Sequence, residues 1–599
     1  MKELQKRSDV RAQDQWDLTP VYADLAAYET DFARAKKLIG EFGSLKGTIR
    51  DAASYLRFAQ IEEETERLIS KLFVYGNLKY NEDMTNQAMQ TLNQKGRALF
   101  TEYGTVSAFA EPEILALPDE VFEEILAAPE VEAYRFHLER KRNLKKHILS
   151  NEQEEVMAAF GDVRSASQSA VGIFSNAELS FPDVEDETGK KHLLTNGSYG
   201  QLIKSKDRTL RRNAFETLHR TYGATENTLA FLLTTNMKDW IIEARLRHYE
   251  NSVEKALKPN NIPVAVFYQS IETINDHLDL LHRYVGLKKR ILGLDEMHLY
   301  DLYVPLAEAG QDRYTFEQGV EMAMQGLKPM GEEYMAAFHA GVENGWIDKY
   351  ENLGKRSGAY SSGVYDTMPY ISLNFDGTMS DVSTFVHEMG HSMHSFYSRG
   401  NQPYIYGNYS IFLAEVASTC NEKLLIHHLI GKETDRDKRI ALINQELEQV
   451  RTTVYRQLMF AEFEKVTHER LEAGEQLNAG DLDQIWLDLN RKFFGEDMVI
   501  DEAIKYEWAR IPHFYNDFYV YQYATGYAMA SSFARTILHE GTQAAQRYID
   551  KFLKAGSSKY PVDVMKDAGV DITTPQPLQD TLKDFSELMD QLEREYGLA

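Results

Sequence analysis

The run Thr384-Phe-Val-His-Glu-Met-Gly-His-Ser-Met-His394 is the most informative part of this chain, because it holds the pattern His-Glu-x-x-His. On a helix, positions four apart lie close in angle and roughly 6 Å apart along the axis, so both imidazoles can reach one ion. Zinc accepts such nitrogens, and three protein ligands plus one water make a hydrolytic site. The pattern predicts a metal site with His387 and His391 as ligands. Glu388 points to the neighbouring flank, where it can act as the general base.

The residues around this run predict a strand followed by a capped helix. Residues 369–377 alternate between two faces, with Ile371, Leu373 and Phe375 on one and Tyr370, Ser372 and Asn374 on the other. This alternation predicts a strand with one solvent-facing side, and a substrate peptide can pair with the edge of such a strand. Gly377 ends the strand, and Ser380 or Asp381 can cap the helix. Apolar residues then recur at helical spacing, at Val382, Phe385, Val386, Met389, Met393 and Phe396.

A third ligand must come from another helix. His394 lies seven residues after His387, about 10.5 Å along the axis, too far to bind the same ion easily. A metzincin would need His at position 397, where this chain has Tyr397, so that class is excluded. Downstream, Glu415 and Glu422 share one face of a second helical pattern. Glu415 is the favoured ligand, and Glu422 is the better candidate for accepting a hydrogen bond from a ligand imidazole. The alternative for either is a solvated helix carboxylate.

Several stretches resemble one known family. His387-Glu-Met-Gly-His-Ser-Met-His394, followed by Glu415-Val-Ala-Ser, resembles the paired signature of the thimet oligopeptidase superfamily of metallopeptidases. Within that superfamily, Gly363-Val-Tyr-Asp-Thr-Met-Pro-Tyr370 and the opening Trp16-Asp-Leu-Thr-Pro-Val-Tyr22 resemble the oligoendopeptidase F branch. The likeness runs from near residue 16 to near residue 585. Many relatives have Pro and Gln where this chain has Ala417 and Thr419, a departure that concerns helix packing and not the ligand.

The resemblance implies both an activity and an architecture. It implies a zinc metalloendopeptidase of the gluzincin type, with one Zn²⁺ per chain on His387, His391 and Glu415. It also implies two lobes, in which an N-terminal helical part closes over the catalytic part and the metal lies in a deep channel. Such a channel would restrict the enzyme to short unstructured oligopeptides. The strand around residues 371–375 and the Gly-rich run 357–363 are expected to hold the peptide backbone, since small residues allow close approach.

A second constellation lies between His513 and Tyr527, where five of fifteen residues are tyrosines. A phenol or imidazole N–H beside the metal can donate to the oxyanion that forms during attack on a peptide carbonyl. The resemblance assigns that work to a histidine and two tyrosines, which match His513, Tyr519 and Tyr527. Tyr521 is an alternative to Tyr519. A buried aromatic wall is the favoured interpretation of Tyr515, Tyr521 and Tyr523.

Composition limits the remaining possibilities. The chain has 599 residues, 43% of them hydrophobic, so it can bury a large core. A formal net charge of −26 disfavours nucleic acids and anionic membranes as partners. No run of 18 apolar residues is present, and residues 1–8 lack the apolar stretch of a secretory signal. The single cysteine, Cys420, agrees with a reducing compartment and is expected to be a small buried residue. A cytoplasmic location is predicted.

The pattern along the chain predicts a mainly α protein with a small β-sheet beside the active site. Residues 1–200 are expected to form an N-terminal helical region, which forms part of the channel wall or a lid. A small hairpin is expected near residues 178–195, from the alternation around the turn Asp186-Glu-Thr-Gly189. Residues 201–599 are expected to form the catalytic domain. Few prolines, 15 in all, interrupt the helical patterns.

Two other functions remain open from the sequence. A peptidyl-dipeptidase or carboxypeptidase could use the same metal site, but it needs a cation to hold the substrate's terminal carboxylate. Arg510 is a candidate for that cation, although an ordinary salt bridge is the favoured use of it. A catalytically silent peptide-binding protein is the second alternative, and the intact set of His387, Glu388, His391 and Glu415 argues against it.

Overall fold

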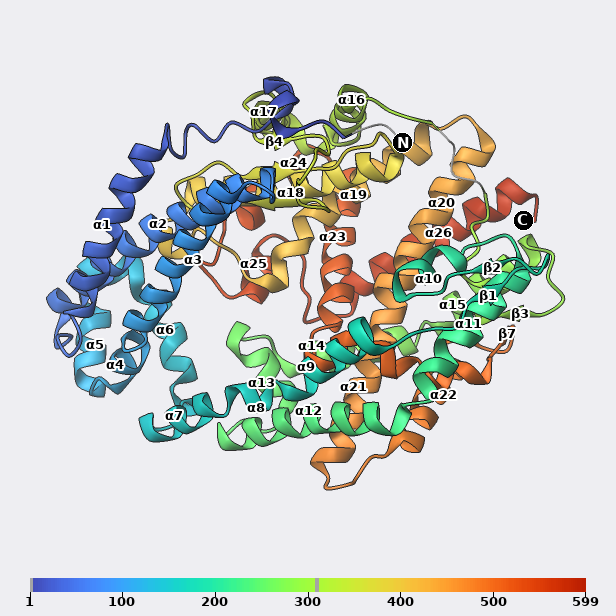
Figure 1. The fold of residues 1–599 in the computed structure, drawn as a ribbon, viewed down its shortest axis with the longest axis horizontal. Helices are drawn as coiled ribbons and strands as arrows, with labels where there is room; N and C mark the ends of the chain where they lie inside the picture. The colour runs from blue at the N-terminus through green and yellow to red at the C-terminus, as the bar shows by residue number, and fades with distance from the viewer. Residues whose placement is uncertain (1–3, 308–311, 599) are drawn as a thin grey trace. The chain divides into compact units, whose positions relative to one another are not determined.

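The computed structural model describes residues 4–307 and 312–598, and its regular structure is mainly helical (Figure 1). In the described residues the strands are two or three residues long and form small sheets. The predicted fold class, mainly α with a small sheet, is confirmed in this respect. Residues 1–3, which belong to the stretch considered above for a secretory signal, lie outside the described residues.

The chain divides by its internal contacts into two compact units, each built from three segments. The first unit contains Met1–Lys146, Gln311–His428 and Phe533–Val570, and the second contains His147–Gly310, Leu429–Ser532 and Asp571–Ala599. These units do not follow the predicted division of the chain near residue 200, which stays a prediction. Both candidate ligand helices contribute their ligand residues to the first unit.

The first unit holds the N-terminal helices and the helices that carry the His-Glu-x-x-His pattern and Glu415. Its helices are α1 (Leu25–Gly43), α2 (Ala52–Glu82), α3 (Gln87–Ser107), α4 (Ala110–Ala116), α5 (Asp119–Ala127), α6 (Arg135–Leu144), α16 (Phe316–Gly326), α17 (Gly331–Glu343), α18 (Met379–Asn401), α19 (Ile411–Lys432), α24 (Thr542–Tyr548) and α25 (Pro561–Asp567). Its strands are β4 (Ile347–Asp348), β5 (Tyr360–Ser362) and β6 (Tyr370–Ser372). The last residues of α19 belong to the second unit.

One hydrophobic core joins the N-terminal helices of the first unit to its sheet. Phe42 of α1 lies between Phe58 of α2 and Tyr103 of α3, with ring centroids 5.1 and 5.8 Å away. The same core includes Tyr370 of β6, against which the ring of Trp16 stands edge-on at 6.2 Å. Aromatic pairs in this geometry add to the stabilisation from buried area. The N-terminal helices therefore support the sheet from which the metal-site helix follows.

The sheet of the first unit has the order β4-β6-β5, with β4 parallel and β5 antiparallel to β6. The predicted strand at residues 369–377 is present only as β6, and the prediction of a solvent-facing side is wrong. Tyr370 is 1% exposed and Ser372 is 0% exposed, because the N-terminal core covers Tyr370 and α18 packs against the same sheet. Since β6 has partners on both sides, it offers no free edge to a peptide. The outer strand beside α18 is β5, from the Gly-rich run.

The second unit is also helical and contains residues 513–527, called the tyrosine segment below. Its helices are α7 (Asn151–Ala159), α8 (Gly161–Arg164), α9 (Ala166–Ile173), α10 (Asn196–Leu202), α11 (Arg208–Gly223), α12 (Glu226–Leu246), α13 (Ser252–Leu257), α14 (Val264–Asn275), α15 (Leu278–Ile291), α20 (Arg436–Val450), α21 (Arg456–Glu472), α22 (Ala479–Phe494), α23 (Tyr521–Glu540) and α26 (Gln576–Tyr596). Its strands are β1 (Val184–Glu185), β2 (Lys191–His192), β3 (Met297–His298) and β7 (Met498–Val499). The later residues of α23 belong to the first unit.

The hairpin expected near residues 178–195 is present as the antiparallel pair β1 and β2. Asp186 closes its turn by accepting hydrogen bonds from the N–H groups of Thr188 and Lys190, each at 3.0 Å. Gly189 has a φ of 81°, a backbone conformation that glycine adopts without strain. The turn residues therefore fix this hairpin locally.

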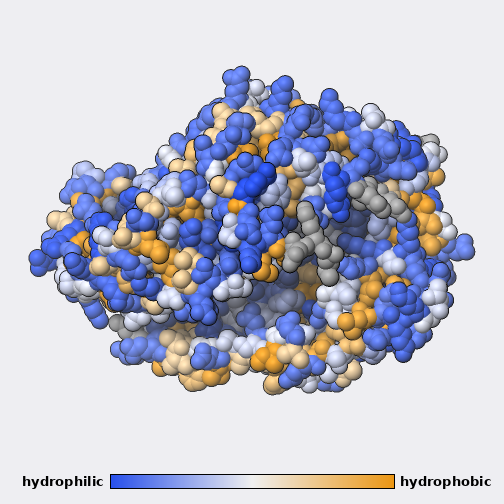
Figure 2. Space-filling model, turned by 45° about the horizontal axis from the view of Figure 1, so that its top comes forward, coloured by the Kyte–Doolittle hydropathy of each residue, from blue (hydrophilic) through white to orange (hydrophobic). Residues whose placement is uncertain are grey.

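On the face shown in Figure 2, hydrophilic residues cover most of the surface, and hydrophobic residues lie between them in small groups. Within the described ranges, no helix combines the length and the apolar character that crossing a membrane requires.

Candidate active site

Helix α18 carries the His-Glu-x-x-His pattern and starts at a capping box. The Thr378 hydroxyl accepts the Asp381 N–H at 3.1 Å, and the Asp381 carboxylate accepts the Thr378 N–H at 2.8 Å. The N-cap is therefore Thr378, and the expectation of Ser380 or Asp381 as the cap is wrong. The reason is that Gly377, with a φ of 87°, turns the chain so sharply that the helix begins at Met379.

One face of α18 is buried, as its pattern predicts. Val382, Phe385, Val386, Met389 and Met393 are each 0% exposed. Phe396 is the exception, because its ring lies against Trp346 but remains 37% exposed. With the apolar stripe inside, the side chains of His387 and His391 lie on another face and are 27% and 18% exposed. Both imidazoles are therefore accessible to an ion.

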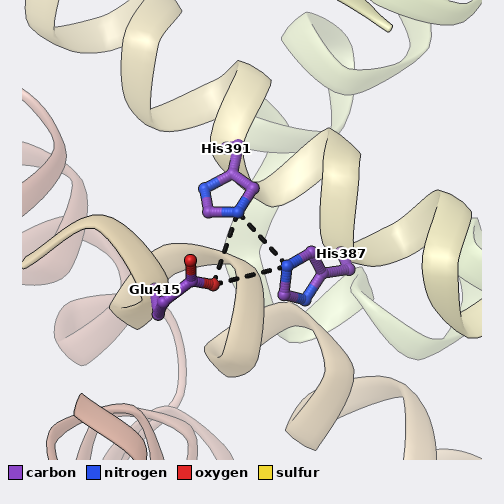
Figure 3. Close-up of side chains that lie close together, drawn as sticks. All are labelled: His387, His391 and Glu415. Atoms are coloured by element: carbon purple, nitrogen blue, oxygen red, sulfur yellow. Dashed lines mark hydrogen bonds and ion pairs between the residues drawn. The ribbon is translucent and has the colours of Figure 1, made fainter. Parts of the chain in front are cut away.

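Helix α19 brings Glu415 to the two histidines (Figure 3). The Nε2 atoms of His387 and His391 lie 3.2 Å apart. Glu415 Oε2 lies 3.4 Å from the first and 3.5 Å from the second. These are the three residues that the sequence predicts as metal ligands. The structure brings them together from two helices.

The three atoms fit a single tetrahedral ion. Donors bound to zinc at about 2.0–2.1 Å with tetrahedral angles lie about 3.3–3.4 Å from one another. The observed separations of 3.2, 3.4 and 3.5 Å match this triangle. Two imidazole nitrogens facing each other also need a proton or a cation between them. The donor set, two nitrogens and one carboxylate oxygen, is one that zinc prefers.

Glu422 holds the other side of the first histidine. Its Oε2 lies 3.2 Å from His387 Nδ1, and its Oε1 accepts the Ser383 hydroxyl at 3.2 Å. This arrangement fixes the imidazole with Nδ1 as donor and Nε2 free for a metal. Burial opposes a positive charge on His387, but the hydrogen bonds to Glu415 and Glu422 outweigh it and raise its pKa to about 10. The pocket therefore favours positive charge, from a proton or from an ion.

Glu388 lies between the two ligand histidines in sequence and is buried, at 7% exposed. Burial raises the pKa of its carboxyl, while the neighbouring histidines and a hydrogen bond from the Ser361 backbone act in the opposite direction. Ser361 belongs to β5, and its hydroxyl lies 2.9 Å from that of Ser392 on α18. The outer strand of the sheet therefore runs beside the carboxylate that the sequence predicts as the general base.

His394 and Cys420 have structural surroundings. The His394 ring stacks on Tyr409 with centroids 3.6 Å apart and planes within 2°, and burial lowers its pKa to about 3. It does not belong to the group of ligand atoms around His387. Cys420 is fully buried, and burial raises the pKa of its thiol to about 12. Neither residue contributes a metal ligand or a nucleophile here, in agreement with the sequence-based interpretation.

The tyrosine segment lies in the second unit; a 3₁₀ helix, Glu502–Arg510, precedes it, and a short 3₁₀ turn, Pro512–Tyr515, includes its first residues. His513 is exposed, and Tyr519 is partly buried. Both rings meet Tyr523, at centroid distances of 5.9 and 5.3 Å. Desolvation by the surrounding protein lowers the pKa of His513 below its usual 6.5, although the residue is exposed by surface area, so its imidazole is neutral at pH 7. The structure thus gathers His513 and Tyr519 around one further tyrosine.

Tyr527 lies on α23 and is buried, at 7% exposed. Its hydroxyl donates to Glu446 Oε1 at 2.7 Å. Tyr521, the alternative to Tyr519, is only 1% exposed and packs edge-on against Phe267. Its burial supports a place in the aromatic wall, as does that of Tyr515 at 7%. Tyr523, predicted for the same wall, is only partly buried.

A buried carboxyl group fixes the bend before Tyr519. Phe518 has a φ of 59°, which costs a non-glycine residue of order 1–3 kcal/mol. Its N–H donates at 2.7 Å to Glu464, which is 0% exposed. Burial raises the pKa of Glu464 well above its usual value, and Asp517 raises it further. The buried Glu464 carboxyl therefore stabilises the strained turn that precedes Tyr519, through its hydrogen bond from the Phe518 N–H.

Arg510, the candidate for holding a terminal carboxylate, already has partners. Its guanidinium lies 3.6 Å from Glu507 and 5.4 Å from the centre of the Tyr199 ring. This is the salt bridge that the sequence favours for it.

Sequence reasoning missed several residues that support the site. Ser383 and Ser361 carried no signal, since a serine in a helix or strand has many uses. Asn421 donates to the Val386 carbonyl at 3.4 Å and accepts the Tyr334 hydroxyl at 2.9 Å. An amide at a buried helix position was a usable signal, because buried polar groups need partners. Phe518 gave none, since a positive φ at a phenylalanine has no sequence mark.

The site is of the metallopeptidase type. It has two histidines from one helix, a glutamate from the next helix, and a buried glutamate between the two histidines in sequence. Comparison with known families agrees. Residues 201–584 match the family model described as "Peptidase family M3", and residues 113–181 match the one described as "Oligopeptidase F". The chain therefore belongs to peptidase family M3, in its oligopeptidase F group. The predicted family and the predicted metalloendopeptidase class are confirmed.

Individual relatives cover nearly the whole chain. Oligopeptidase PepF of Bacillus subtilis is 42% identical over 99% of this chain and 88% of the relative. An oligoendopeptidase F homolog of Lactococcus lactis is 39% identical over 98% of both chains. Among solved structures, a protein from Chlamydophila abortus has a TM-score of 0.94 at 34% identity, covering 99% of this chain and 100% of that one. Oligoendopeptidase-F from Enterococcus faecium has a TM-score of 0.73 at 34% identity, covering 96% and 99%.

Proposed function

We propose that this chain is a zinc-dependent endopeptidase that hydrolyses internal bonds of short, unstructured oligopeptides. One observation carries the proposal: His387 Nε2, His391 Nε2 and Glu415 Oε2 form the donor triangle of a tetrahedral ion, with Glu388 buried on the same helix. One Zn²⁺ per chain on these three residues is part of the proposal. The names of the relatives, oligopeptidase and oligoendopeptidase F, support the substrate class.

The chemistry at the metal follows from the residues around it. His387, His391 and Glu415 would hold the zinc, which would supply an acidified water, with a pKa towards about 7, and an electrophile for the scissile carbonyl. Glu388 takes a proton from the attacking water and passes it to the leaving amine. Its burial favours proton uptake, because desolvation raises the pKa of the carboxyl. Glu422 keeps His387 oriented throughout, through the hydrogen bond at Nδ1.

Strand β5 is the element proposed to hold the substrate backbone. It pairs with β6 on one side and lies beside α18, to which Ser361 is tied through Ser392. An extended peptide can add to such an outer strand through main-chain hydrogen bonds. The Gly-rich run 357–363 is therefore still proposed to hold the substrate backbone. Strand β6, which was expected to share this role, is no longer proposed for it.

His513, Tyr519 and Tyr527 are proposed as donors to the oxyanion. Their residue types support this role, since a phenol and a neutral imidazole both carry a suitable donor. Tyr527 is buried and its hydroxyl donates to Glu446 Oε1, so donation to an oxyanion requires this hydrogen bond to be exchanged. Tyr519 is preferred over Tyr521, because Tyr521 is buried against Phe267.

The proposed architecture has an N-terminal region, residues 1–200, and a catalytic domain, residues 201–599. The boundary is supported by the two family models, which end at residue 181 and begin at residue 201. Two lobes around a deep channel, with the N-terminal region as wall or lid, belong to the same proposal and would exclude folded proteins. A cytoplasmic location is also proposed, since a lone buried cysteine suits a reducing compartment.

One assay tests the proposal as a whole. Peptides of graded length, blocked at both ends, and one long unfolded protein are incubated with the enzyme, with and without a chelator, and the products are identified by mass spectrometry. Internal cuts in short blocked peptides, lost with chelator and restored by zinc, are expected. Cleavage that resists the chelator contradicts the zinc mechanism. Cuts confined to unblocked ends indicate an exopeptidase, and binding without hydrolysis in zinc-loaded protein indicates a silent binding protein.

A further inference from the structure

The two ligand helices, α18 and α19, run antiparallel and meet at a series of paired positions. Ser383 contacts Glu422, and Val386 contacts Asn421, at distances of 3.2 and 3.4 Å. Further along α18, Gly390 lies one residue before the ligand His391 and faces α19. The ligand triangle therefore depends on how closely the two helices approach at this point.

Gly390 is the position of closest approach. A Cβ atom placed there would lie 2.5 Å from Ser418 Cα, 2.8 Å from the Ala417 carbonyl oxygen and 2.9 Å from Ser418 N. All three are backbone atoms, so no side-chain rotation can remove the clash. Non-bonded carbon atoms pack at about 3.5–4.0 Å, so any side chain at this position would move the helices apart by about 1 Å.

Ser418 connects this contact to the third ligand. Its side chain is 0% exposed. Its hydroxyl lies 3.0 Å from the Glu415 carbonyl oxygen and 3.2 Å from Glu415 Oε2. Oε2 is the same atom that meets the two imidazoles. The residue that touches Gly390 thus also orients the carboxylate one turn earlier on its own helix.

We infer that Gly390 and Ser418 are positioning residues for the metal. The missing side chain at Gly390 sets the separation of the ligand helices, and the Ser418 hydroxyl orients the Glu415 carboxylate toward the two imidazoles. The inference rests on the proposed zinc site but not on the peptidase reaction. A ligand oxygen displaced by about 1 Å leaves the bonding range of about 2.0–2.2 Å. Zinc affinity is therefore the property that these two residues control.

The main test compares Gly390→Ala with Gly400→Ala, two identical changes in one helix. At Gly400 an added Cβ meets nothing within 4 Å. Alanine gains helix propensity over glycine at both positions, about 1 kcal/mol in the helix interior at Gly390 and less at Gly400, the last residue but one of α18. Zinc affinity is measured by competition with a chromogenic chelator, and the Co²⁺-substituted protein is examined by visible absorption. We expect at least a tenfold weaker zinc affinity and an altered cobalt spectrum for Gly390→Ala, with neither change for Gly400→Ala.

A second pair of variants keeps the inference testable if Gly390→Ala does not fold. Ser418→Ala removes the hydroxyl without adding bulk, and Ser398→Ala removes a similarly buried hydroxyl of α18 that donates to the Gly407 carbonyl. We expect a several-fold loss of zinc affinity for Ser418→Ala and none for Ser398→Ala. The inference is overturned if both Gly390→Ala and Ser418→Ala show wild-type zinc affinity and wild-type cobalt spectra. If the glycine variant is unfolded, the same result in Ser418→Ala alone overturns it. A loss of thermal stability that is equal with and without zinc would also do so, since that is the mark of a purely structural role. Wild-type protein that binds no zinc would instead overturn the proposed function.

Discussion

The cluster of candidate metal ligands, His387, His391 and Glu415, and the tyrosine segment reach their geometry in different ways. At the cluster, three ligand atoms from α18 and α19 lie within 3.5 Å of one another. Regular helices, backbone contact at Gly390 and charged hydrogen bonds hold them there. In the tyrosine segment, His513, Tyr519 and Tyr527 come from a 3₁₀ turn, a strained bend and a helix, and their exposure ranges from open to buried.

This contrast shows what each kind of site requires. A metal needs several donors at one point, and helical spacing delivers two of them automatically. The proposed donors to the oxyanion need only to reach one oxygen, so irregular backbone can present them. The positions in the tyrosine segment then depend on buried partners such as Glu464 and Glu446. Four substitutions test whether the two regions are held in these different ways.

Glu388→Gln is expected to have the largest effect. It removes the general base but keeps the shape of the side chain, so turnover should fall by about 10³–10⁴-fold. The ligand triangle is untouched, and zinc content, measured by metal analysis, should stay at the wild-type level. Peptide cleavage is followed by mass spectrometry. Substantial turnover in zinc-loaded Glu388→Gln would contradict the assignment of the base.

Tyr527→Phe should have the next largest effect, because it removes a proposed donor to the oxyanion. Loss of one such donor lowers kcat by about 10²–10³-fold, with little change in KM. The matched control is Tyr515→Phe, which deletes a hydroxyl from another buried tyrosine of the same segment. Equal activity in the two variants would mean that the hydrogen bond to Glu446 serves the fold alone.

Glu507 lies in the 3₁₀ helix that precedes the tyrosine segment, and Glu507→Gln tests whether its charge stabilises this region. The test is the pH dependence of the free energy of unfolding. Burial opposes ionisation of Glu507, but Arg456, His219 and Arg510 outweigh it and lower the pKa of the carboxyl to about 2, from 4.5 when unfolded. Its stabilisation is therefore complete above pH 4.5 and is lost as the pH falls through about 2. Urea unfolding at pH 7 should show a loss of about 3 kcal/mol, which shrinks as the pH falls below 4.5.

The control for this measurement lies in the same turn. Glu502 pairs with Lys505 on the surface, and its side chain is 81% exposed. Glu502→Gln should change the free energy of unfolding by less than about 0.5 kcal/mol at any pH. A deficit in Glu507→Gln that stays constant down to pH 2 would argue against a charged Glu507.

Glu422→Gln should have the smallest effect. The amide keeps the size of the side chain but accepts more weakly from His387 Nδ1, so zinc affinity should fall by about tenfold. Chelator competition measures the change, and Ser383→Ala, which removes only the outer hydrogen bond to Glu422, should show less. Unchanged affinity in Glu422→Gln would show that the helices alone orient the imidazole.

Much of the metal site could be predicted from the sequence, because its geometry repeats the period of a helix. The spacing of His387 and His391 and the apolar stripe from Val382 to Met393 both follow from 3.6 residues per turn. The cap and the strand were predicted less well. Thr378 lies directly after a glycine turn, and the burial of Tyr370 depends on Trp16, more than three hundred residues away in the chain.

The tyrosine segment could be located but not resolved from the sequence. Five tyrosines marked the place, yet nothing local distinguishes Tyr521, which packs into the core, from Tyr519, which stays partly exposed. That distinction depends on the bend at Phe518 and on the carboxyl of Glu464, which comes from another helix. A tertiary hydrogen bond stabilises a backbone conformation that no local propensity favours.

The family, the mainly helical fold and the identity of the candidate ligands could all be predicted from the sequence, because they depend on residue types at fixed spacing. Three other features required the three-dimensional structure: the strand that keeps a free edge, the glutamates that meet the imidazoles at Nε2 and at Nδ1, and the lack of room for a side chain at position 390. These features are contacts between segments that are distant in the chain. Close packing between such segments leaves tolerances of about 1 Å, which a one-dimensional pattern does not encode.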